Sequence, residues 1–472
     1  MSRTNLSLEA LACAALLGAC ALPPPGRGAA PALELPTSAT TAPTAVALDW
    51  WTTFNDPALT ALVTEALANN RDLGRAVARI DESRALLQSA RSDLLPSLTA
   101  DIAGSRQRVT ETGSFSQGSP TRSNVRAALN ASYEVDLWSR LAKASAAARA
   151  ELLALTSTRD ALVGVISVQV VQAYASLQAQ DQQRQLFGAA VDAQRDSLRL
   201  QGLRAAAGDI GELDLRQLEA ELAANEAQLP RLERSIGETE RALAVLLGRS
   251  PRALIEQAVP RAALSAALPN VAPVPAGLPS DLLQHRPDVQ AAQARLAAAG
   301  ARVDAARAAY FPRIALTASL GRESADLSRL FDGPSLVWNA LASATQPIWG
   351  AGRLEAQSDA ARARERIAEL DYRDSVANAF ADARNALGAR SEAAQSLRLA
   401  QARGSALARA AELTRLRYNG GEASRLQWIE AERAALNAQA QQADAHRALV
   451  AAQADLYRAL GGGWNAERLA ER

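Results

Sequence analysis

The residue types that most often perform catalysis or bind metals are scarce in this chain and lie far apart. Its two histidines are His285 and His446, and both of its cysteines, Cys13 and Cys20, lie within the first 20 residues. Lys143 is the only lysine, which excludes a phosphate-binding loop of the G-x-x-x-x-G-K type. Metal sites need several such ligands close together. The sequence therefore predicts no catalytic residue, no metal site and no enzymatic activity.

The remaining candidates for chemistry are charged side chains beside two glycines, Gly208 and Gly421, which interrupt long helical patterns. Asp209 and Glu212 follow the first glycine, and Glu422 follows the second. Acidic residues suit the first turn of a helix, because they accept hydrogen bonds from free backbone N–H groups and complement the helix dipole. One interpretation is that these acids only cap and solubilise two turns between helices.

The N-terminal segment predicts export from the cytoplasm. Arg3 precedes an apolar run that ends near residue 19 and is too short to span a membrane. Residues 17–20, LGAC, resemble the lipobox of bacterial lipoproteins, which predicts a covalent lipid on Cys20 and no other cofactor. Ordinary signal cleavage at Ala19-Cys20-Ala21 is the alternative. The Pro/Ala/Thr-rich residues that follow suit an extended tether.

Composition indicates long helices and gives no sign of a nucleic-acid partner. The chain has 472 residues, with 51 basic and 50 acidic side chains, so it carries no general electrostatic field. Aromatic residues make up only 4% of the chain, while alanine, leucine, arginine and glutamine fill long stretches. That composition is typical of long helices and coiled coils.

The chain reads as an internal duplication. Residues 72–98 align without gaps to residues 288–314, which pairs Pro96 with Pro312. Farther along, "LRAAAGDIGELDLRQLEAE" aligns to "LRYNGGEASRLQWIEAERA", which pairs Gly208 with Gly421. Each repeat is predicted to contain short helices, a proline, two strands, a long helix, a glycine turn and a second long helix.

Four segments predict β-strands, because apolar and polar residues alternate along them with a period of two. The clearest is residues 124–138, NVRAALNASYEVDLW, in which every second residue from Val125 to Leu137 is apolar. The other three predicted strands are residues 97–109, 313–324 and 335–349. They form two hairpins, each with a polar loop.

A very long helix is predicted after each hairpin, at about residues 140–205 and 351–417, each followed by a returning helix of roughly 35 residues. Apolar residues at spacings of three and four indicate coiled-coil seams, as from Val163 to Leu177. The β-branched residues 162–171 have strand character, but their place inside a helical stretch favours a helix.

Four strands of about 10–13 residues cannot close into a barrel by themselves. Packing against the protein's own helices is one solution. However, the strand length, the alternation and the export signal also match transmembrane β-strands. Because a bilayer forbids unpaired strand edges, such strands would have to close by oligomerisation.

The motifs resemble the TolC/OprM-type outer membrane channels of bacterial efflux systems, particularly the NodT-type lipoprotein branch. The resemblance rests on "WWTTFNDPALTALVTEALANNRDL" near the mature start, on "LLQHRPDVQAAQARLAAAGARVDAARAAYFPRIALTASLG", and on the glycine turns. It implies a mixed, mainly α fold in which three protomers build an α-helical tunnel of long antiparallel coiled coils. Each protomer would give four strands to one shared transmembrane β-barrel.

The resemblance and the sequence patterns together predict the following segments. They are a lipoprotein signal peptide (1–19), an acylated tether (20–49), the repeat 1 short helices (50–95), hairpin (96–138) and helical hairpin (139–250), a linker (251–280), and the repeat 2 helix (281–311), hairpin (312–349) and helical hairpin with the C-terminal tail (350–472). Pro96 and Pro312 mark the helix-to-barrel junctions, because proline ends a helix and tolerates the first position of a strand.

By the same resemblance, the glycine turns form a periplasmic aperture closed by hydrogen bonds and charge pairs. Asp214 matches an aspartate of the family network and Tyr418 matches its tyrosine partner. The arginine expected two residues after Gly421 is Ala423 here, with Arg425 nearby as a substitute. Gln427 also stands where some relatives have an acid. The aperture candidates are Asp214, Tyr418, Arg204, Asp209, Arg417, Glu422, Arg425 and Glu430.

The resemblance implies a passive exit duct for small molecules, located in the outer membrane, lipid-anchored and extending into the periplasm. Its expected partners are two further copies of the chain, a periplasmic adaptor (membrane fusion) protein, an inner membrane pump of the resistance-nodulation-division type, and outer membrane lipids. The alternatives are an outer membrane duct for protein secretion and a lipid-anchored periplasmic coiled-coil scaffold.

Overall fold

The computed structural model describes residues 49–108, 121–208, 210–253, 259–263, 286–350 and 352–462. The predicted signal peptide and most of the tether, with Cys20, lie outside these residues, as do Asp209 and His285. The described chain forms two compact units. Unit 1 contains residues 80–154 and 292–373, and unit 2 contains the rest.

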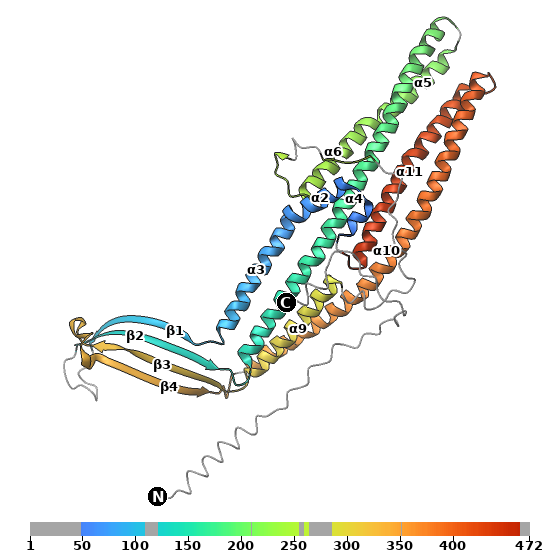
Figure 1. Cartoon of the computed structure of the whole chain (residues 1–472). Helices are drawn as coiled ribbons and strands as arrows, with labels where there is room; N and C mark the ends of the chain where they lie inside the picture. Colours follow the sequence, from blue (N-terminus) through green and yellow to red (C-terminus); the bar gives the residue numbers. More distant parts are fainter. Residues whose placement is uncertain are drawn as a thin grey trace. The chain divides into compact units, whose positions relative to one another are not determined.

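Unit 1 contains a four-stranded antiparallel sheet in the order β1-β2-β3-β4 (Figure 1). Its strands are β1 (Ser97–Arg108), β2 (Thr121–Val135), β3 (Arg313–Ser324) and β4 (Leu336–Thr345). The two predicted hairpins are joined by the pairing of β2 with β3. Among the described residues β1 pairs only with β2 and β4 only with β3, so both outer edges of the sheet are unpaired.

Over most of the sheet the register places apolar residues on one face and polar residues on the other, although Arg322 lies on the first face and Leu341 on the second. One row across the strands consists of Ala100, Leu129, Leu320 and Trp338. On the opposite face, Arg126 donates to Ser319 over 2.9 Å, and Asn124 donates to Glu323 over the same distance. The alternation in the sequence therefore corresponds to a two-faced sheet.

Two predicted strand ends are wrong. The second strand was expected to continue to residue 138, but Asp136 instead accepts hydrogen bonds from the backbone N–H groups of Leu141 and Ala142 and so caps the next helix. The fourth strand was expected to reach residue 349, but β4 ends at Thr345, and Pro347 lacks the N–H group that a ladder needs.

The two long helices have equal lengths. α4 (Arg140–Ala206) and α10 (Arg353–Asn419) each contain 67 residues. Both begin after a residue with positive φ, Ser139 (60°) and Gly352 (78°). The predicted helix at 162–171 lies inside α4. An apolar window of α4 is long enough to cross a membrane by length and composition, but half of that window is buried inside the protein.

The returning helices differ between the two halves. α11 (Arg425–Ala459) is one helix of 35 residues, as predicted. In the first half the predicted helix is divided into α5 (Glu212–Glu226) and α6 (Gln228–Leu246). Pro230 explains the break, because it has no N–H for the carbonyl four residues earlier and its ring crowds that carbonyl. The prediction of one continuous helix was therefore wrong here.

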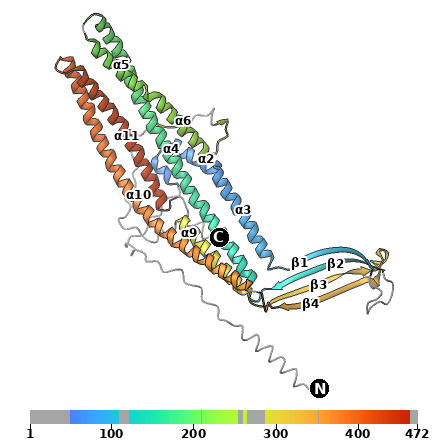
Figure 2. The same ribbon diagram turned by 180° about the vertical axis from the view of Figure 1, so that it is seen from behind.

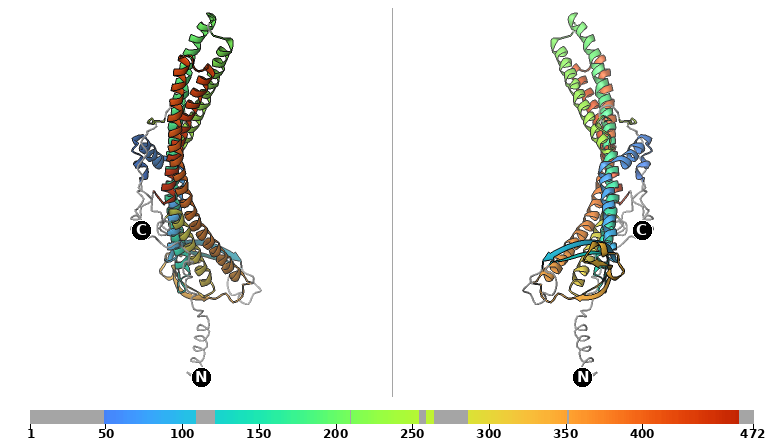
Figure 3. Two further views of the ribbon diagram at one scale, coloured as in Figure 1. Left: turned by 90° about the vertical axis from the view of Figure 1, so that its right-hand side faces the viewer. Right: turned by 90° about the vertical axis from the view of Figure 1, so that its left-hand side faces the viewer.

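Unit 2 also contains η1 (Trp50–Phe54), α2 (Pro57–Asn69) and the hydrophobic core. Figures 2 and 3 show its two helical hairpins, α4 with α5 and α6, and α10 with α11. Trp50 is fully buried and stacks on Tyr457 of α11, with ring centroids 5.0 Å apart. The core residues of α4 include members of the predicted coiled-coil seam: Ile166, Val170 and Leu177.

Two helices of equal length, α3 (Arg71–Ser92) and α9 (Pro287–Ala308), each begin after a buried polar residue. Asn70 accepts hydrogen bonds from the first backbone N–H groups of α3 and donates to the Leu246 carbonyl over 2.8 Å. Arg286 occupies the matching place before α9 and donates to the Ala459 carbonyl over 3.0 Å. The two halves of unit 2 therefore have a hydrogen-bonding residue at the same place, but it is an asparagine in the first half and an arginine in the second.

Candidate functional site

Metal-binding clusters are absent from the part of the chain that the structure describes. No group of three or more His, Cys, Asp or Glu residues there is arranged to hold a metal ion. The features that remain are the two glycine turns, a linker held on the helices of unit 2, and the exposed sheet of unit 1.

Both glycine turns use the left-handed conformation. Gly208, after α4, has φ of 83°, and Gly421, after α10, has φ of 80°. Glycine tolerates this region, whereas an L side chain is strained there. Nothing lies within 4 Å of a Cβ built on either residue, so backbone conformation and not space requires glycine.

The second turn contains an ordered cluster around Arg425, the first residue of α11. Its Nη1 donates to the Tyr418 hydroxyl over 3.2 Å, and its Nη2 donates to Ser197 Oγ of α4 over 2.8 Å. The guanidinium carbon lies 4.4 Å from the centroid of the Trp428 ring. Tyr418 and Trp428 stack on one another with centroids 5.1 Å apart. We call these four residues the turn cluster.

A capping box fixes the start of α11. Ser424 accepts from the Gln427 backbone N–H, and the Gln427 side chain accepts from the Ser424 N–H over 2.9 Å. Gln427 therefore has a local structural role as the N3 residue of this capping box.

The other aperture candidates lie on the surface of the turns. Arg417 donates to the Glu422 carbonyl over 3.3 Å, and the charged groups of these two exposed residues approach to 3.9 Å. Asp214 lies in the first turn of α5, partly exposed, where an acid suits the helix dipole. The structure gives it no contact with Tyr418. Arg204 and Glu430 are exposed, and Asp209 lies outside the described residues.

Sequence reasoning missed two members of the turn cluster, Ser197 and Trp428. Ser197 is 228 positions from Arg425, so only the tertiary structure brings them together. Trp428 follows Arg425 by three positions, which on a helix places both side chains on one face. Because the chain has only seven tryptophans, this spacing could have indicated a contact between Arg425 and Trp428.

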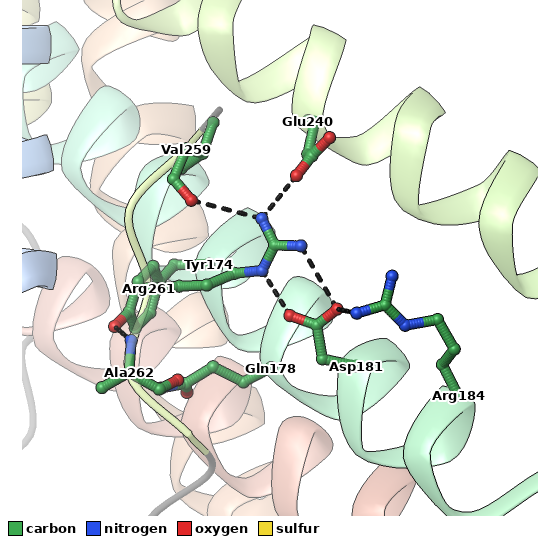
Figure 4. Close-up of polar contacts among 8 residues, drawn as sticks. All are labelled: Tyr174, Gln178, Asp181, Arg184, Glu240, Val259, Arg261 and Ala262. Atoms are coloured by element: carbon green, nitrogen blue, oxygen red, sulfur yellow. Dashed lines mark hydrogen bonds and ion pairs between the residues drawn. The ribbon is translucent and has the colours of Figure 1, made fainter. Parts of the chain in front are cut away.

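A second polar cluster holds the linker between the two halves on the helices of unit 2 (Figure 4). Arg261 bonds to Asp181 of α4 and to Glu240 of α6, and it also donates to the Val259 carbonyl over 3.2 Å. The bond to Asp181, followed by that to Glu240, raises the pKa of Arg261, although burial opposes this. The charge on Arg261 is therefore permanent. We call this cluster the linker clasp.

Backbone bonds complete the linker clasp. The Tyr174 hydroxyl accepts from the Ala262 N–H over 3.0 Å and donates to Asp56 over 2.6 Å. Gln178, one turn farther along α4, donates to the Ala262 carbonyl over 3.1 Å. Burial, and next the bond to Asp56, raises the pKa of Tyr174 above its usual range, so the phenol keeps its proton. These contacts hold residues 259–262 of the linker against α4 and α6.

The two proline junctions lie where the sequence placed them. Pro96 and Pro312 directly precede β1 and β3. At the second junction Trp138 donates to the Pro312 carbonyl over 2.9 Å and stacks on Phe311 at 4.8 Å. This contact fastens the end of β2 to the start of β3.

The apolar face of the sheet is exposed over much of its area. Ile102 is 85% exposed and Trp338 is 74% exposed. Further exposed apolar side chains on the same face are Leu98, Leu129, Leu316, Leu320 and Leu336. A contiguous row of exposed large apolar side chains of this kind is typical of a surface that meets lipid or another protein.

Comparison with known proteins places these features in a family. The profile of the family described as "Outer membrane efflux protein" matches residues 62–249 and 278–462. The chain is 34% identical over 476 residues to the pyoverdine export outer membrane protein OpmQ of Pseudomonas aeruginosa, covering 99% of this chain and 98% of that protein.

It is 33% identical over 475 residues to the outer membrane protein OprJ of the same organism, with the same coverage. Among solved structures, the CmeC outer membrane channel of Campylobacter jejuni superimposes with a TM-score of 0.85. That match covers 94% of this chain and 97% of CmeC at 25% identity.

Proposed function

Because the chain belongs to the outer membrane efflux protein family, we propose that it is the outer membrane subunit of a tripartite efflux system and acts as a passive duct. The exposed apolar face of the sheet carries this proposal, together with the family match. Energy would come from an inner membrane pump of the resistance-nodulation-division type, linked by a periplasmic adaptor. The duct itself would perform no catalysis.

The sheet supports a place in the membrane. One face of the sheet is mostly apolar, the other carries hydrogen-bonded polar side chains, and the strands have 10 to 15 residues. These lengths suit tilted membrane strands. A bilayer does not tolerate the free edges of β1 and β4, so the sheet would close with further copies of the chain. Three copies would give a barrel of twelve strands.

The two halves of the sheet predict the register between copies. Leu98 pairs with Ala131 in the first hairpin, and Ile314, its aligned partner, pairs with Ala344 in the second. Ala344 therefore corresponds to Ala131. Within one chain, Ala131 of β2 pairs with Ala318 of β3, and Ala318 is aligned with Ile102 of β1. The same pairing between β4 and the β1 of the next copy would put Ala344 opposite Ile102, and therefore Ser343 opposite Ala103. Both residues lie on the polar face.

Cysteine cross-linking tests this register. The double variant Ala103→Cys with Ser343→Cys should form disulfide-linked dimers and trimers in outer membranes, because the two side chains would be directly opposite. The matched control, Ser105→Cys with Ser343→Cys, uses the same face two positions out of register and should link much less. Links only within one chain, or equal links in both variants, would contradict closure between copies.

The matching halves support the proposal that the chain arose by duplication. The bounds of α10 are those of α4 moved along by 213 positions, from 140 to 353 and from 206 to 419. The glycines of the two turns fall at the same offset, at 208 and 421. We further propose lipidation of Cys20, which labelled palmitate should detect in the wild type and not in Cys20→Ser.

The glycine turns are the proposed periplasmic aperture. The ordered turn cluster supports a closed resting state there. Replacing Asp214 and Tyr418 together by alanine should raise the single-channel conductance in a planar bilayer. An unchanged conductance would leave Asp214 with helix capping only.

The names of the relatives support a small-molecule substrate, since one is described as a pyoverdine export protein and another as a solvent efflux pump outer membrane protein. Deleting the gene should raise cellular accumulation of at least one small solute. A loss of secreted protein with unchanged accumulation of every solute would point to a secretion duct. A water-soluble monomer, obtained when Cys20 is removed, would point to a periplasmic scaffold.

A further inference from the structure

The two faces of the sheet differ in the sign of their charged residues. On the polar face, arginines are accompanied by the acids Asp101, Glu134 and Glu323. On the apolar face, every charged residue of the four described strands is an arginine: Arg106, Arg108 and Arg322. Charges that only keep a surface in solution are usually of both signs. The single sign on the apolar face therefore indicates an anionic partner.

All three of these arginines lie at one end of the sheet. It is the end at which β1 and β3 finish, whereas the other end connects to α4 and α10 (Figure 1). Eight residues separate Leu98 from Arg106, and eight separate Ile314 from Arg322, which is about 27 Å along each strand. In strands tilted by about 40–45°, this length crosses roughly 20 Å of the apolar band of a membrane barrel, which is about 25 Å tall. The arginines would therefore lie at one boundary of the bilayer.

The position of these arginines suits the outer leaflet. Under the proposed function the helices extend into the periplasm, so the opposite end of the sheet faces the cell exterior. An arginine is costly at the centre of a bilayer and far less so near the boundary, where its guanidinium reaches the lipid headgroups. Trp338 lies on the same face and is 74% exposed. Tryptophan favours this interfacial level.

The turn between β3 and β4 already orients Arg322. Its Nη1 donates to the Phe331 carbonyl over 2.6 Å and to the Asp332 carbonyl over 3.0 Å. The guanidinium carbon lies 5.9 Å from the centroid of the Phe331 ring. The turn itself is fixed, because the buried Ser335 hydroxyl donates to the Leu330 carbonyl over 2.6 Å. Arg322 is thus held at a defined place on the rim of the sheet.

One edge of the Arg322 guanidinium remains available for an anion. Among the described residues, its Nε and Nη2 have no acceptor, and neither acid of the turn, Asp326 or Asp332, forms an ion pair with it. These two nitrogens lie on one side of a planar group, which is the geometry that binds two oxygens of a phosphate.

The register proposed above brings a second arginine close to Arg322. Arg106 is exposed, and Arg106 of the next copy would lie opposite Ala340. Arg322 lies opposite Leu336 on the other side of β4. The two arginine Cα atoms would then be two strand spacings and four residues apart, about 16 Å. With Trp338 between them on β4, two extended arginine side chains could reach one headgroup that carries two phosphates.

We propose that Arg322 and Arg106 of the next copy bind the phosphate groups of the outer-leaflet glycolipid, lipopolysaccharide, with Trp338 against its acyl chains. The inference rests on the proposed function as an outer membrane duct. A closed barrel of three copies would have three such sites, one at each junction between copies. Arg108 already interacts with another group of the protein, so the two phosphate ligands are Arg106 and Arg322.

Binding of diphosphoryl lipid A to the purified full-length protein in detergent tests the site. Native mass spectrometry should show up to three lipid A molecules on a trimer, and the double variant Arg106→Gln with Arg322→Gln should raise the Kd about tenfold or more. Arg106→Gln alone should raise the Kd about threefold, and it leaves the contacts of Arg322 with its turn intact. The matched control is Arg126→Gln, which removes an arginine from the polar face beside Arg322 and should leave the Kd unchanged.

Two further lipids identify what the arginines bind. Monophosphoryl lipid A should bind more weakly than the diphosphoryl form to the wild type, and the difference should disappear in the double variant, because the second phosphate would have lost its ligand. Phosphatidylglycerol and inorganic phosphate should displace diphosphoryl lipid A only at concentrations at least tenfold above its own Kd.

Each outcome decides the proposal. An unchanged Kd in the double variant, or an equal rise in Arg126→Gln, would overturn the site while leaving the duct intact. Equal affinity for phosphatidylglycerol would overturn the choice of glycolipid and leave a general attraction for anionic lipid. If the wild type purifies as a water-soluble monomer, the proposed function itself fails, and the lipid site fails with it.

Discussion

Asn70 and Arg286 occupy matched places in the two halves of unit 2, yet they hold those halves by different means. Asn70 is a neutral cap that joins the start of α3 to α6. Arg286 is a buried cation that donates to Asp288, to Asp382 and to the carbonyls of α10 and α11. Although burial opposes it, these two acids raise the pKa of Arg286.

The contrast extends along the hairpins. Within the described residues, the two buried arginines, Arg286 and Arg425, belong to the second half, whereas buried asparagines, Asn70 and Asn225, belong to the first. The first half instead uses the linker clasp on α4 and α6. The first half is thus stabilised by hydrogen bonds of buried asparagine side chains and by the linker clasp. The second half is stabilised by buried arginine side chains.

The largest expected effect is a difference in the free energy of unfolding between variants at Arg286 and at Asn70. Arg286→Met should lower the free energy of unfolding by about 3 kcal/mol or more, because it leaves two backbone carbonyls and two acids without their donor. Asn70→Ala should lower it by about 1–2 kcal/mol, the usual range for a lost cap and one bond. Denaturant titrations followed by the helix signal at 222 nm would measure both. Equal losses would remove the contrast between the halves.

Adding a proline to one returning helix and removing it from the other tests the difference between them. Ala443 in α11 matches Pro230 of α6, and it is buried. Ala443→Pro should destabilise the protein by about 3 kcal/mol, through the lost backbone bond and the ring clash. Pro230→Ala should instead slow amide exchange in residues 226–231 by joining α5 and α6. Exchange that stays fast would show that Pro230 is not the cause of the break.

The linker clasp should have a smaller effect, confined to the first half. Arg261→Met should cost about 1–2 kcal/mol, since its bonds to Asp181 and Glu240 are charge-assisted but partly exposed to solvent. Limited proteolysis of the linker should accelerate. Arg184→Met is the control, because Arg184 touches Asp181 only at 3.6 Å and is half exposed. Equal proteolysis in both variants would argue against a clasp.

The smallest expected effect lies on the surface of the first turn. Arg216 pairs with Glu212 and Glu219 on α5, and all three side chains are well exposed. Arg216→Ala should leave the unfolding midpoint and the conductance unchanged, because solvent and salt screen such pairs. A change in conductance as large as that expected when Asp214 and Tyr418 are both replaced by alanine would contradict this expectation.

The features that sequence alone could predict are those with a local signal. Alternation identified the four strands, prolines marked where β1 and β3 begin, and glycines marked the two turns. Pro230 was also visible, but a strong helical pattern around it hid the break in the returning helix. The roles of Arg286, Arg261 and Ser197 could not be predicted, because each also bonds to residues many positions away that only packing brings near.

The candidate site was predicted in part. Tyr418 and Arg425 do meet in the structure, but around Trp428 and Ser197. The structure shows no bond from Asp214 to this cluster. The resemblance indicated the region but not the bonds, because Ser197 is 228 positions from Arg425 and only the tertiary structure brings the two together.

The equal lengths of α4 and α10 constrain how the chain can evolve. One residue inserted into a helix advances everything beyond it by about 1.5 Å and turns it by about 100°. An insertion in α4 alone would move Ser197 out of step with Arg425 and rotate the α4 seam away from its neighbours. Changes in the length of one long helix would therefore persist only with a matching change in the other. Across descendants of this sequence, insertions and deletions in the two helices should occur as compensated pairs.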